Sequence, residues 1–156
     1  MLNIGDKAPL SIKVLDEKEN KVSLNDFKGE YIVVYFYPKD STPGCTKESC
    51  DFRDLNSEIE KLGAKIIGTS KDSLASHEKF KTKHKLNFEL WSDPEHKLME
   101  AFGSWGKKKM MGREYMGTIR STFIIDPKGK IVHVWDKVKV LGHVADVFEQ
   151  LKQLIK

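Results

Sequence analysis

Cysteine, proline and long apolar runs are all scarce in this 156-residue chain, which has two cysteines and five prolines. No segment approaches the roughly 20 apolar residues of a membrane helix, and the N-terminal segment lacks the basic head and apolar stretch of a signal peptide. Two cysteines are too few for the disulfide framework of a secreted domain, and a chain of this length can bury a core without one. We therefore expect a cytoplasmic protein that does not enter the membrane, provided that no leader was removed.

Features that would divide the chain are missing as well. The sequence has no internal repeat, no low-complexity tract and no linker rich in proline, glycine or serine. Its 39% hydrophobic and 32% charged residues are typical of a folded, well-solvated protein. We therefore predict a single domain over residues 1–156.

The charge is only mildly biased, at +4, and lysines alternate with acids along the chain. Residues 106–113 form the densest basic segment, but glycine and methionine interrupt its four charges, which is typical of a solvated loop rather than a nucleic-acid-binding patch. The five histidines lie scattered, at no metal-ligand spacing from the cysteines, and we predict surface positions for them. They are His77, His84, His96, His133 and His143. Neither nucleic acid nor a metal ion is expected as a partner.

The spacing of apolar residues predicts strands that alternate with helices. The predicted strands are residues 12–15, 21–23, 31–37, 64–69, 88–91, 121–126 and 131–135. The predicted helices are residues 45–62, 73–84, a third with Asp93 as N-cap and Pro94 as its first residue, and 144–155. This order predicts an α/β fold with a central mixed β-sheet and helices on both faces.

The segment PKDSTPGCTKESC, residues 38–50, lies between a buried strand and a helix. With Thr42 as N-cap and Pro43 as the first helical residue, Cys45 falls in the first turn. Backbone N–H groups there have no helical partner, and together with the helix dipole they favour an anion. We therefore expect the Cys45 sulfur to ionise readily and to act as a nucleophile.

Ionisation alone makes a weak catalyst, because it can raise the reactive fraction of an ordinary thiol at most roughly 30-fold. A displacement by sulfur also needs donors aimed at the oxygens on which charge develops. The Thr42 hydroxyl is one candidate. Arg120 is another, because it begins a predicted strand and could reach the end of the strand before Cys45, whereas Arg53 lies roughly 12 Å further along the helix. Two simpler roles stay open: Thr42 as a plain helix cap, and Arg120 as the partner of an acid.

Cys50 follows Cys45 by five positions. In an intact helix their α-carbons would be roughly 8 to 9 Å apart, whereas a disulfide needs less than about 7 Å. If the two cysteines pair, the first turns of the helix must unwind, and the protein alternates between a folded reduced form and a locally unfolded oxidised form. Taken alone, Cys50 could equally be an inert core residue.

The segments around Cys45 and Arg120 resemble the peroxiredoxins, and specifically the bacterioferritin comigratory protein subfamily. The family motif Pro-x-x-x-Thr-x-x-Cys is met by Pro38, Thr42 and Cys45, and the second cysteine of the subfamily by Cys50. The distal block of the subfamily resembles MGREYMGTIRSTFIID at residues 111–126. The similarity extends from about Ile4 to the last helix.

This resemblance implies a thioredoxin-like fold without a metal or organic cofactor. It implies a monomeric thiol peroxidase in which Cys45 is the peroxidatic residue and Cys50 the resolving residue, with thioredoxin or a similar dithiol protein as reductant. Four further residues receive roles from the resemblance: Thr42 and Arg120 as partners of sulfur and peroxide, Pro38 as a shield of the pocket, and Glu48 as the residue that orients the arginine. Without the resemblance, Glu48 is typical of a solvated helix acid.

Two other functions compete with a hydroperoxide reductase. A thiol–disulfide oxidoreductase usually has two residues between its cysteines, whereas four separate Cys45 from Cys50. A non-enzymatic metal sensor, redox sensor or binding module would rely on two cysteines without clustered histidines, or on the basic residues 107–113. Consumption of hydrogen peroxide without a protein disulfide as substrate separates the peroxidase from these alternatives.

Overall fold

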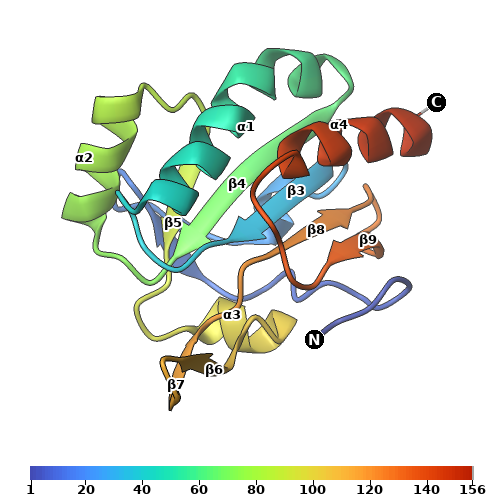
Figure 1. Cartoon of the computed structure of the whole chain (residues 1–156). Coiled ribbons are helices and arrows are strands. Elements are labelled where there is room, and N and C mark those ends of the chain that lie inside the picture. The colour runs from blue at the N-terminus through green and yellow to red at the C-terminus, as the bar shows by residue number, and fades with distance from the viewer. Residues whose placement is uncertain (156) are drawn as a thin grey trace.

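The computed structural model describes residues 1–155 and contains a seven-stranded mixed sheet (Figure 1). The order of its strands is β2-β1-β5-β4-β3-β8-β9. Their bounds are β1 Val14–Asp16, β2 Lys21–Val22, β3 Tyr31–Phe36, β4 Ala64–Ser70, β5 Glu89–Ser92, β8 Ser121–Ile125 and β9 Ile131–Trp135. Strand β4 pairs parallel with β3 and with β5, and all other pairings in this sheet are antiparallel. The mixed sheet predicted from the sequence is confirmed.

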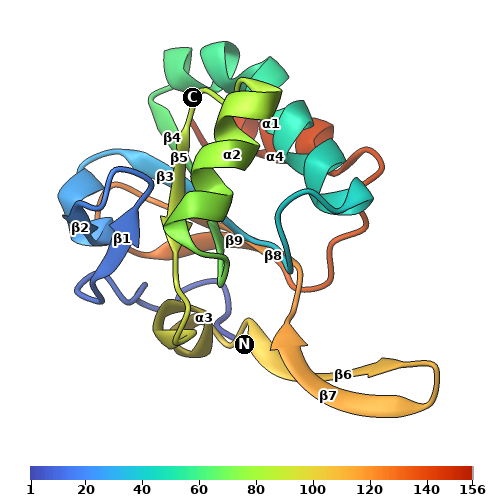
Figure 2. The same cartoon turned by 90° about the vertical axis from the view of Figure 1, so that its left-hand side faces the viewer.

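Helices cover both faces of the sheet, as predicted, and the alternation of side chains along β3 shows why that strand is apolar throughout. Val33 and Tyr35 face a core shared with α1 (Pro43–Lys61), α2 (Leu74–His84) and α4 (His143–Leu154). Val34 and Phe36 face a second core shared with α3 (Lys97–Phe102) and the 3-10 helix η1 (Leu24–Phe27). Figures 1 and 2 show α1, α2 and α4 on one side and α3 on the other. Each large apolar side chain buried in these cores contributes roughly 1.5–3 kcal/mol.

Three segments meet at the edge of the sheet where the parallel strands end. The connections that follow β3 and β4 leave at this edge because the two strands are parallel. Strand β8 begins there because it pairs antiparallel with β3, with Ser121 opposite Phe36. The register therefore brings Arg120, which precedes β8, next to the connection between β3 and α1. Ligand and catalytic sites of open α/β sheets lie at this kind of edge.

The predicted start of the third helix at Asp93-Pro94 is wrong. Residues 93–96 form a turn in which the His96 N–H donates to the Asp93 carbonyl at 2.9 Å, and α3 begins only at Lys97. Asp93 still serves the helix, because its Oδ2 accepts the N–H of Met99 at 3.0 Å. The capping residue therefore lies one turn before the helix that it stabilises.

The basic segment predicted to be a solvated loop is instead a β-hairpin, formed by β6 (Trp105–Met110) and β7 (Arg113–Thr118). Met111 and Gly112 at its tip both have positive φ, 53° and 80°, which suits the twist of a two-residue hairpin turn. Figure 2 shows the hairpin extending away from the body of the protein. Because neither face of its tip is covered by the core, the strands lack the apolar alternation that predicts a strand. Within residues 1–155, no helix is long and apolar enough to span a membrane.

Candidate active site

Cys45 occupies the position that the sequence predicts, in the first turn of α1. The helix begins at Pro43, and Thr42 has the extended backbone of an N-cap residue (φ −80°, ψ 153°). The Cys45 side chain is fully buried, and its sulfur is a free thiol. The thiol therefore lies at the helix end whose unpaired N–H groups favour an anion.

Arg120 joins this sulfur to a buried carboxylate. Its Nη2 donates to Cys45 Sγ at 3.2 Å and its Nη1 donates to Glu48 Oε1 at 2.7 Å. The Arg120 side chain is 18% exposed and that of Glu48 is fully buried. The interpretation of Glu48 as a solvated helix acid is therefore wrong, and the expected contact of Arg120 with the sulfur is present. Both bonds are charge-assisted when Glu48 and the sulfur are ionised, so the guanidinium is held in one orientation.

Burial and charge pairing act in opposite directions on the pKa values of Glu48 and Arg120. Burial raises the pKa of Glu48 to about 7, although the charge and hydrogen bond of Arg120 oppose the shift. Burial would by itself lower the pKa of Arg120, but the charges of Glu48 and Cys45 outweigh it and raise that pKa above its ordinary value. Arg120 thus stays a cation, and its orientation by an ionised Glu48 is complete only above about pH 7.

Thr42 and Pro38 precede Cys45 by three and seven positions. The Thr42 hydroxyl donates to the Lys39 carbonyl at 2.8 Å and makes no capping bond to the helix, so its position is that of an N-cap but its side chain serves the preceding loop. The oxygen keeps lone pairs that can accept a hydrogen bond from a ligand. Pro38 is half-buried directly after the buried Tyr37. Its role as a shield stays a prediction.

Cys50 lies on the same unbroken helix and is half-buried, with a free thiol. Arg53, the other candidate donor to Cys45, lies next to Cys50 instead. Its Nη1 donates to the His84 carbonyl at 2.7 Å and lies 3.6 Å from Cys50 Sγ. Because both cysteines belong to one intact helix, the structure is that of the reduced, folded form, and pairing them requires the helix to open.

A groove of about 390 Å³ adjoins Arg120 on the side of the β6–β7 hairpin. Its remaining lining residues are Lys107, Lys108, Lys109, Ile119, Lys137 and Val138. Burial and the charge of Arg120 lower the pKa of Lys108, whose Nζ donates to the Thr118 carbonyl at 2.8 Å. The basic segment therefore borders Arg120 and gives this groove a positive charge.

Sequence reasoning missed two buried histidines. His143 is 5% exposed, and its Nε2 lies 2.8 Å from Thr122 Oγ1 and 4.0 Å from Glu48 Oε2. Burial lowers the pKa of His143 to about 4; Arg120 adds to this shift, whereas Asp146 opposes it. Within residues 1–155, Glu48 Oε2 has no hydrogen-bond partner. The signal that could have located His143 is its place four positions before Val147 on the apolar stripe of α4.

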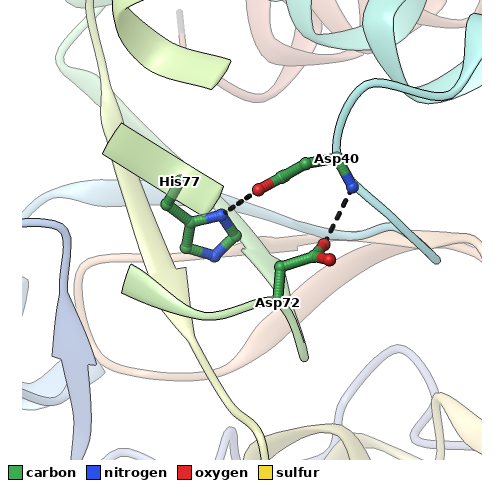
Figure 3. A group of neighbouring side chains, drawn as sticks. All are labelled: Asp40, Asp72 and His77. Atoms are coloured by element: carbon green, nitrogen blue, oxygen red, sulfur yellow. Dashed lines mark hydrogen bonds and ion pairs between the residues drawn. The ribbon is translucent and has the colours of Figure 1, made fainter. Parts of the chain in front are cut away.

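His77 is the second missed histidine and is fully buried. Figure 3 shows its ring next to Asp40, in the connection between β3 and α1, with Asp72 close to both. His77 also continues an apolar helical stripe, three positions before Phe80. The prediction of surface positions is therefore wrong for His77 and His143.

A buried thiol at a helix start, paired with a guanidinium at the carboxyl edge of a mixed sheet, places this protein among the thiol-dependent peroxidases. Comparison with known proteins agrees. The AhpC/TSA family model matches residues 4–134. Peroxiredoxin Bcp of Bacillus subtilis is 52% identical over 153 residues, which are 98% of this chain and 97% of that protein.

Solved structures give the same answer. The bacterioferritin comigratory protein of Xanthomonas campestris, described for its alkyl peroxide reduction activity, is 40% identical with a TM-score of 0.91, over 97% of this chain and 100% of that one. A cysteine-to-serine mutant of PrxQ from Xylella fastidiosa is 36% identical with a TM-score of 0.95, over 100% of this chain and 99% of that one. The chain belongs to the AhpC/TSA family and, within it, to the Bcp (PrxQ) peroxiredoxins. It has their thioredoxin-like fold and is a thiol peroxidase that reduces hydroperoxides.

Proposed function

We propose that Cys45 attacks hydrogen peroxide and organic hydroperoxides, that Cys50 then resolves the oxidised Cys45 as an intramolecular disulfide, and that a thioredoxin-type dithiol protein reduces this disulfide. The enzyme would thereby serve antioxidant defence. The observation that carries the proposal is the 3.2 Å hydrogen bond from Arg120 Nη2 to the buried Cys45 Sγ at the start of α1. It supplies a nucleophile and a fixed cation at the same point.

In the attack, the Cys45 thiolate forms a bond to one peroxide oxygen while the O–O bond breaks. The sulfur gives up two electrons, and the leaving oxygen takes them and a proton to become water or an alcohol. Negative charge moves from sulfur to the leaving oxygen, so a donor that faces both stabilises the transition state more than the ground state. Arg120 has this position. Thr42 complements it, because its proton is committed to the Lys39 carbonyl and its oxygen is free to accept the peroxide O–H.

In the resolution, the Cys50 thiol attacks the sulfenic acid of Cys45, an S–S bond forms and water leaves. The first turns of α1 must unwind for the sulfurs to meet, which breaks the bond from Arg120 to Glu48 and the 2.8 Å bond between Ser49 Oγ and the Tyr35 hydroxyl. The unwound segment exposes the disulfide to its reductant. We also propose that the protein acts as a single-domain monomer, because both cysteines of the proposed cycle and the arginine that contacts Cys45 belong to the same chain.

A coupled assay tests this function. Reduced protein, hydrogen peroxide, thioredoxin, thioredoxin reductase and NADPH should give steady NADPH oxidation, and Cys45→Ser should give none. If Cys45→Ser retained the activity, the proposal would fail. If turnover required a protein disulfide in place of the peroxide, the thiol–disulfide oxidoreductase would be the better description.

Gly44 leaves room for the arginine. A β-carbon at this position would lie 3.3 Å from Arg120 Nη2 and 3.9 Å from a Val140 methyl carbon. We expect Gly44→Ala to shift the guanidinium by a few tenths of an ångström and to slow Cys45 oxidation roughly 10-fold, because electrostatic catalysis depends on such positioning. Its effect on helix propensity is favourable by about 0.5–1 kcal/mol, so stability should not fall. Stopped-flow oxidation and thermal unfolding measure the two effects, with Ser57→Ala on the exposed side of α1 as control. An unchanged oxidation rate would contradict this account.

The bond between Tyr35 and Ser49 holds the helix that must open. We expect Tyr35→Phe to speed disulfide formation several-fold, because one buried hydrogen bond contributes about 0.5–1.5 kcal/mol to the folded form. The rate of attack on peroxide should stay close to that of the wild type. Tyr31→Phe, which removes a weaker 3.4 Å bond to Leu154, is the matched control. Rapid quench followed by mass measurement separates the two steps, and slower disulfide formation in Tyr35→Phe would count against local unwinding.

A further inference from the structure

Hydrogen bonds of Asp40, five positions before Cys45, hold the connection between β3 and α1 in place. The side chains of Asp40 and His77 are 2% and 0% exposed, and Figure 3 shows them facing one another. His77 Nδ1 lies 2.7 Å from Asp40 Oδ2. We call these two residues the Asp40–His77 pair.

The hydrogen bonds of the pair fix its proton count. His77 Nε2 lies 3.0 Å from the Trp91 carbonyl, which can only accept, so Nε2 carries a hydrogen. The contact between Nδ1 and Oδ2 therefore needs one further proton, either on the ring as an imidazolium or on the carboxyl group. In both descriptions the pair as a whole is neutral, so no net charge is buried with it.

The remaining acceptors of Asp40 are filled as well. Oδ1 accepts the Tyr37 hydroxyl at 2.6 Å, and Oδ2 also accepts the Ser76 hydroxyl at 2.8 Å. Burial, followed by the charge of Asp40, raises the pKa of Tyr37 well above its ordinary value, so Tyr37 stays a donor. The Asp40 amide donates to Asp72 Oδ2 at 2.8 Å (Figure 3). Asp40, Asp72 and His77 hold ligand-type atoms within 4.8 Å of one another. Both Asp40 oxygens and both His77 nitrogens have protein partners, and Asp72 Oδ2 also accepts the Ser70 hydroxyl at 2.7 Å, so the cluster links the connection after β3 with β4 and α2 through hydrogen bonds.

These hydrogen bonds constrain the residues that immediately precede the first turn of α1. Ser41 follows Asp40 and has a φ of 65°, in the left-handed region that a non-glycine residue keeps only when its surroundings require it. Thr42 comes next and begins α1. Because hydrogen bonds hold both the side chain and the amide of Asp40, the direction in which the backbone enters α1 is fixed.

We propose that Asp40 and His77 are positioning residues of the peroxidatic centre, which fix the Pro38–Thr42 segment and through it the place of Thr42 beside Cys45. This rests on the proposed function of Cys45. The pair bonds to α2 and β5, outside the part of α1 that unwinds, so it holds the same end of the segment in the reduced and the disulfide form. It therefore supports attack on peroxide and is not broken during resolution.

The test follows attack alone, in a Cys50→Ser background, as the second-order rate constant for oxidation by hydrogen peroxide. Asp40→Ala and His77→Ala are each expected to lower it roughly 10- to 100-fold, the range for a misplaced catalytic group. The double variant should be no slower than the slower single variant, because the two residues act as one unit. With Cys50 restored, the rate of disulfide formation should fall less than threefold.

Asp40→Asn separates positioning from general destabilisation. Its amide can donate to His77 Nδ1 and to Ser76, and its carbonyl can accept from Tyr37, so every contact of the pair is retained. We expect it to keep the attack rate within about threefold of the parent, and circular dichroism confirms that each variant is folded at the assay temperature. If Asp40→Ala unfolds, the comparison of Asp40→Asn with His77→Ala gives the same decision.

Three results would overturn the proposal: folded alanine variants as fast as the parent, additive losses in the double variant, or an asparagine variant as slow as the alanine variant. Peptide mapping of the parent protein establishes separately which cysteine is oxidised. A result against the positioning role of the Asp40–His77 pair is therefore distinguishable from a result against Cys45 as the peroxidatic residue.

Discussion

Replacing Arg120 with methionine is expected to slow oxidation of Cys45 by roughly 100- to 1,000-fold, the usual effect of removing one donor from a site where charge develops. The methionine fills similar space but donates neither to Cys45 Sγ nor to Glu48 Oε1, which Arg120 contacts at 3.2 and 2.7 Å. Stopped-flow oxidation in a Cys50→Ser background measures the attack without interference from resolution.

The same substitution should also affect stability in a pH-dependent way. Removing one partner of a buried ion pair costs about 3–5 kcal/mol when the other stays charged. Arg120 lowers the pKa of Glu48, which is about 7 in the wild type, so the pKa lies higher in the variant and in acidic solution Glu48 takes up a proton and avoids most of this penalty. Arg120→Met should therefore be clearly less stable than the wild type at pH 8 and much closer to it at pH 5.5, as measured by urea unfolding.

Arg53→Met is the matched control, because it removes a guanidinium from α1 that lies at Cys50 instead of Cys45. Its rate of attack should match that of the wild type. Equal losses in the two methionine variants would mean that positive charge near the helix, rather than the contact with sulfur, supports the reaction.

Glu48 and His143 should give opposite contributions to the dependence of stability on pH. Burial raises the pKa of Glu48 from 4.5 to about 7, so between these values the folded protein binds more protons than the unfolded chain and loses stability as the pH rises. Burial lowers the pKa of His143 from 6.5 to about 4, so the folded protein binds fewer protons and loses stability as the pH falls through this window. The two contributions largely cancel between about pH 4.5 and 6.5.

Substituting either residue should leave only the other residue's contribution to the dependence of stability on pH. Glu48→Gln should make stability rise with pH between about 4 and 6.5, and His143→Gln should make it fall between about 4.5 and 7, each by on the order of 3 kcal/mol. The double variant should return the weak dependence of the wild type. Urea unfolding at half-unit steps of pH measures all four proteins, and parallel curves for the two single variants would refute the assignment.

Local patterns in the sequence predict the part of the site that lies on one element. The apolar run of β3, the Thr42-Pro43 helix start and the position of Cys45 are all set within a few residues, and all are confirmed. The burial of Glu48 also follows a local rule, since Cys45, Glu48 and Phe52 lie three and four positions apart on one face of α1.

The contacts between elements are different, because they depend on pairings over long sequence separations. Arg120 reaches Cys45 only because β8 pairs antiparallel with β3 in a register that places Ser121 opposite Phe36. The place of Arg120 at the start of a predicted strand marks it as a candidate, but the register makes the contact. The strands of the β6–β7 hairpin were not predicted, because neither face of the hairpin tip packs on the core and the sequence therefore lacks apolar alternation. The burial of His77 was not predicted, because its partner Asp40 lies 37 positions away in the sequence.

One measurement tests the central claim most directly: reduced protein is mixed with one equivalent of hydrogen peroxide, and free thiols and intact mass are followed for wild type, Cys45→Ser and Cys50→Ser. The account predicts that the wild type loses two thiols as one intramolecular disulfide, that Cys50→Ser accumulates sulfenic or further oxidised Cys45, and that Cys45→Ser stays reduced. Oxidation of Cys45→Ser at the rate of the wild type would show that Cys45 is not the peroxidatic residue.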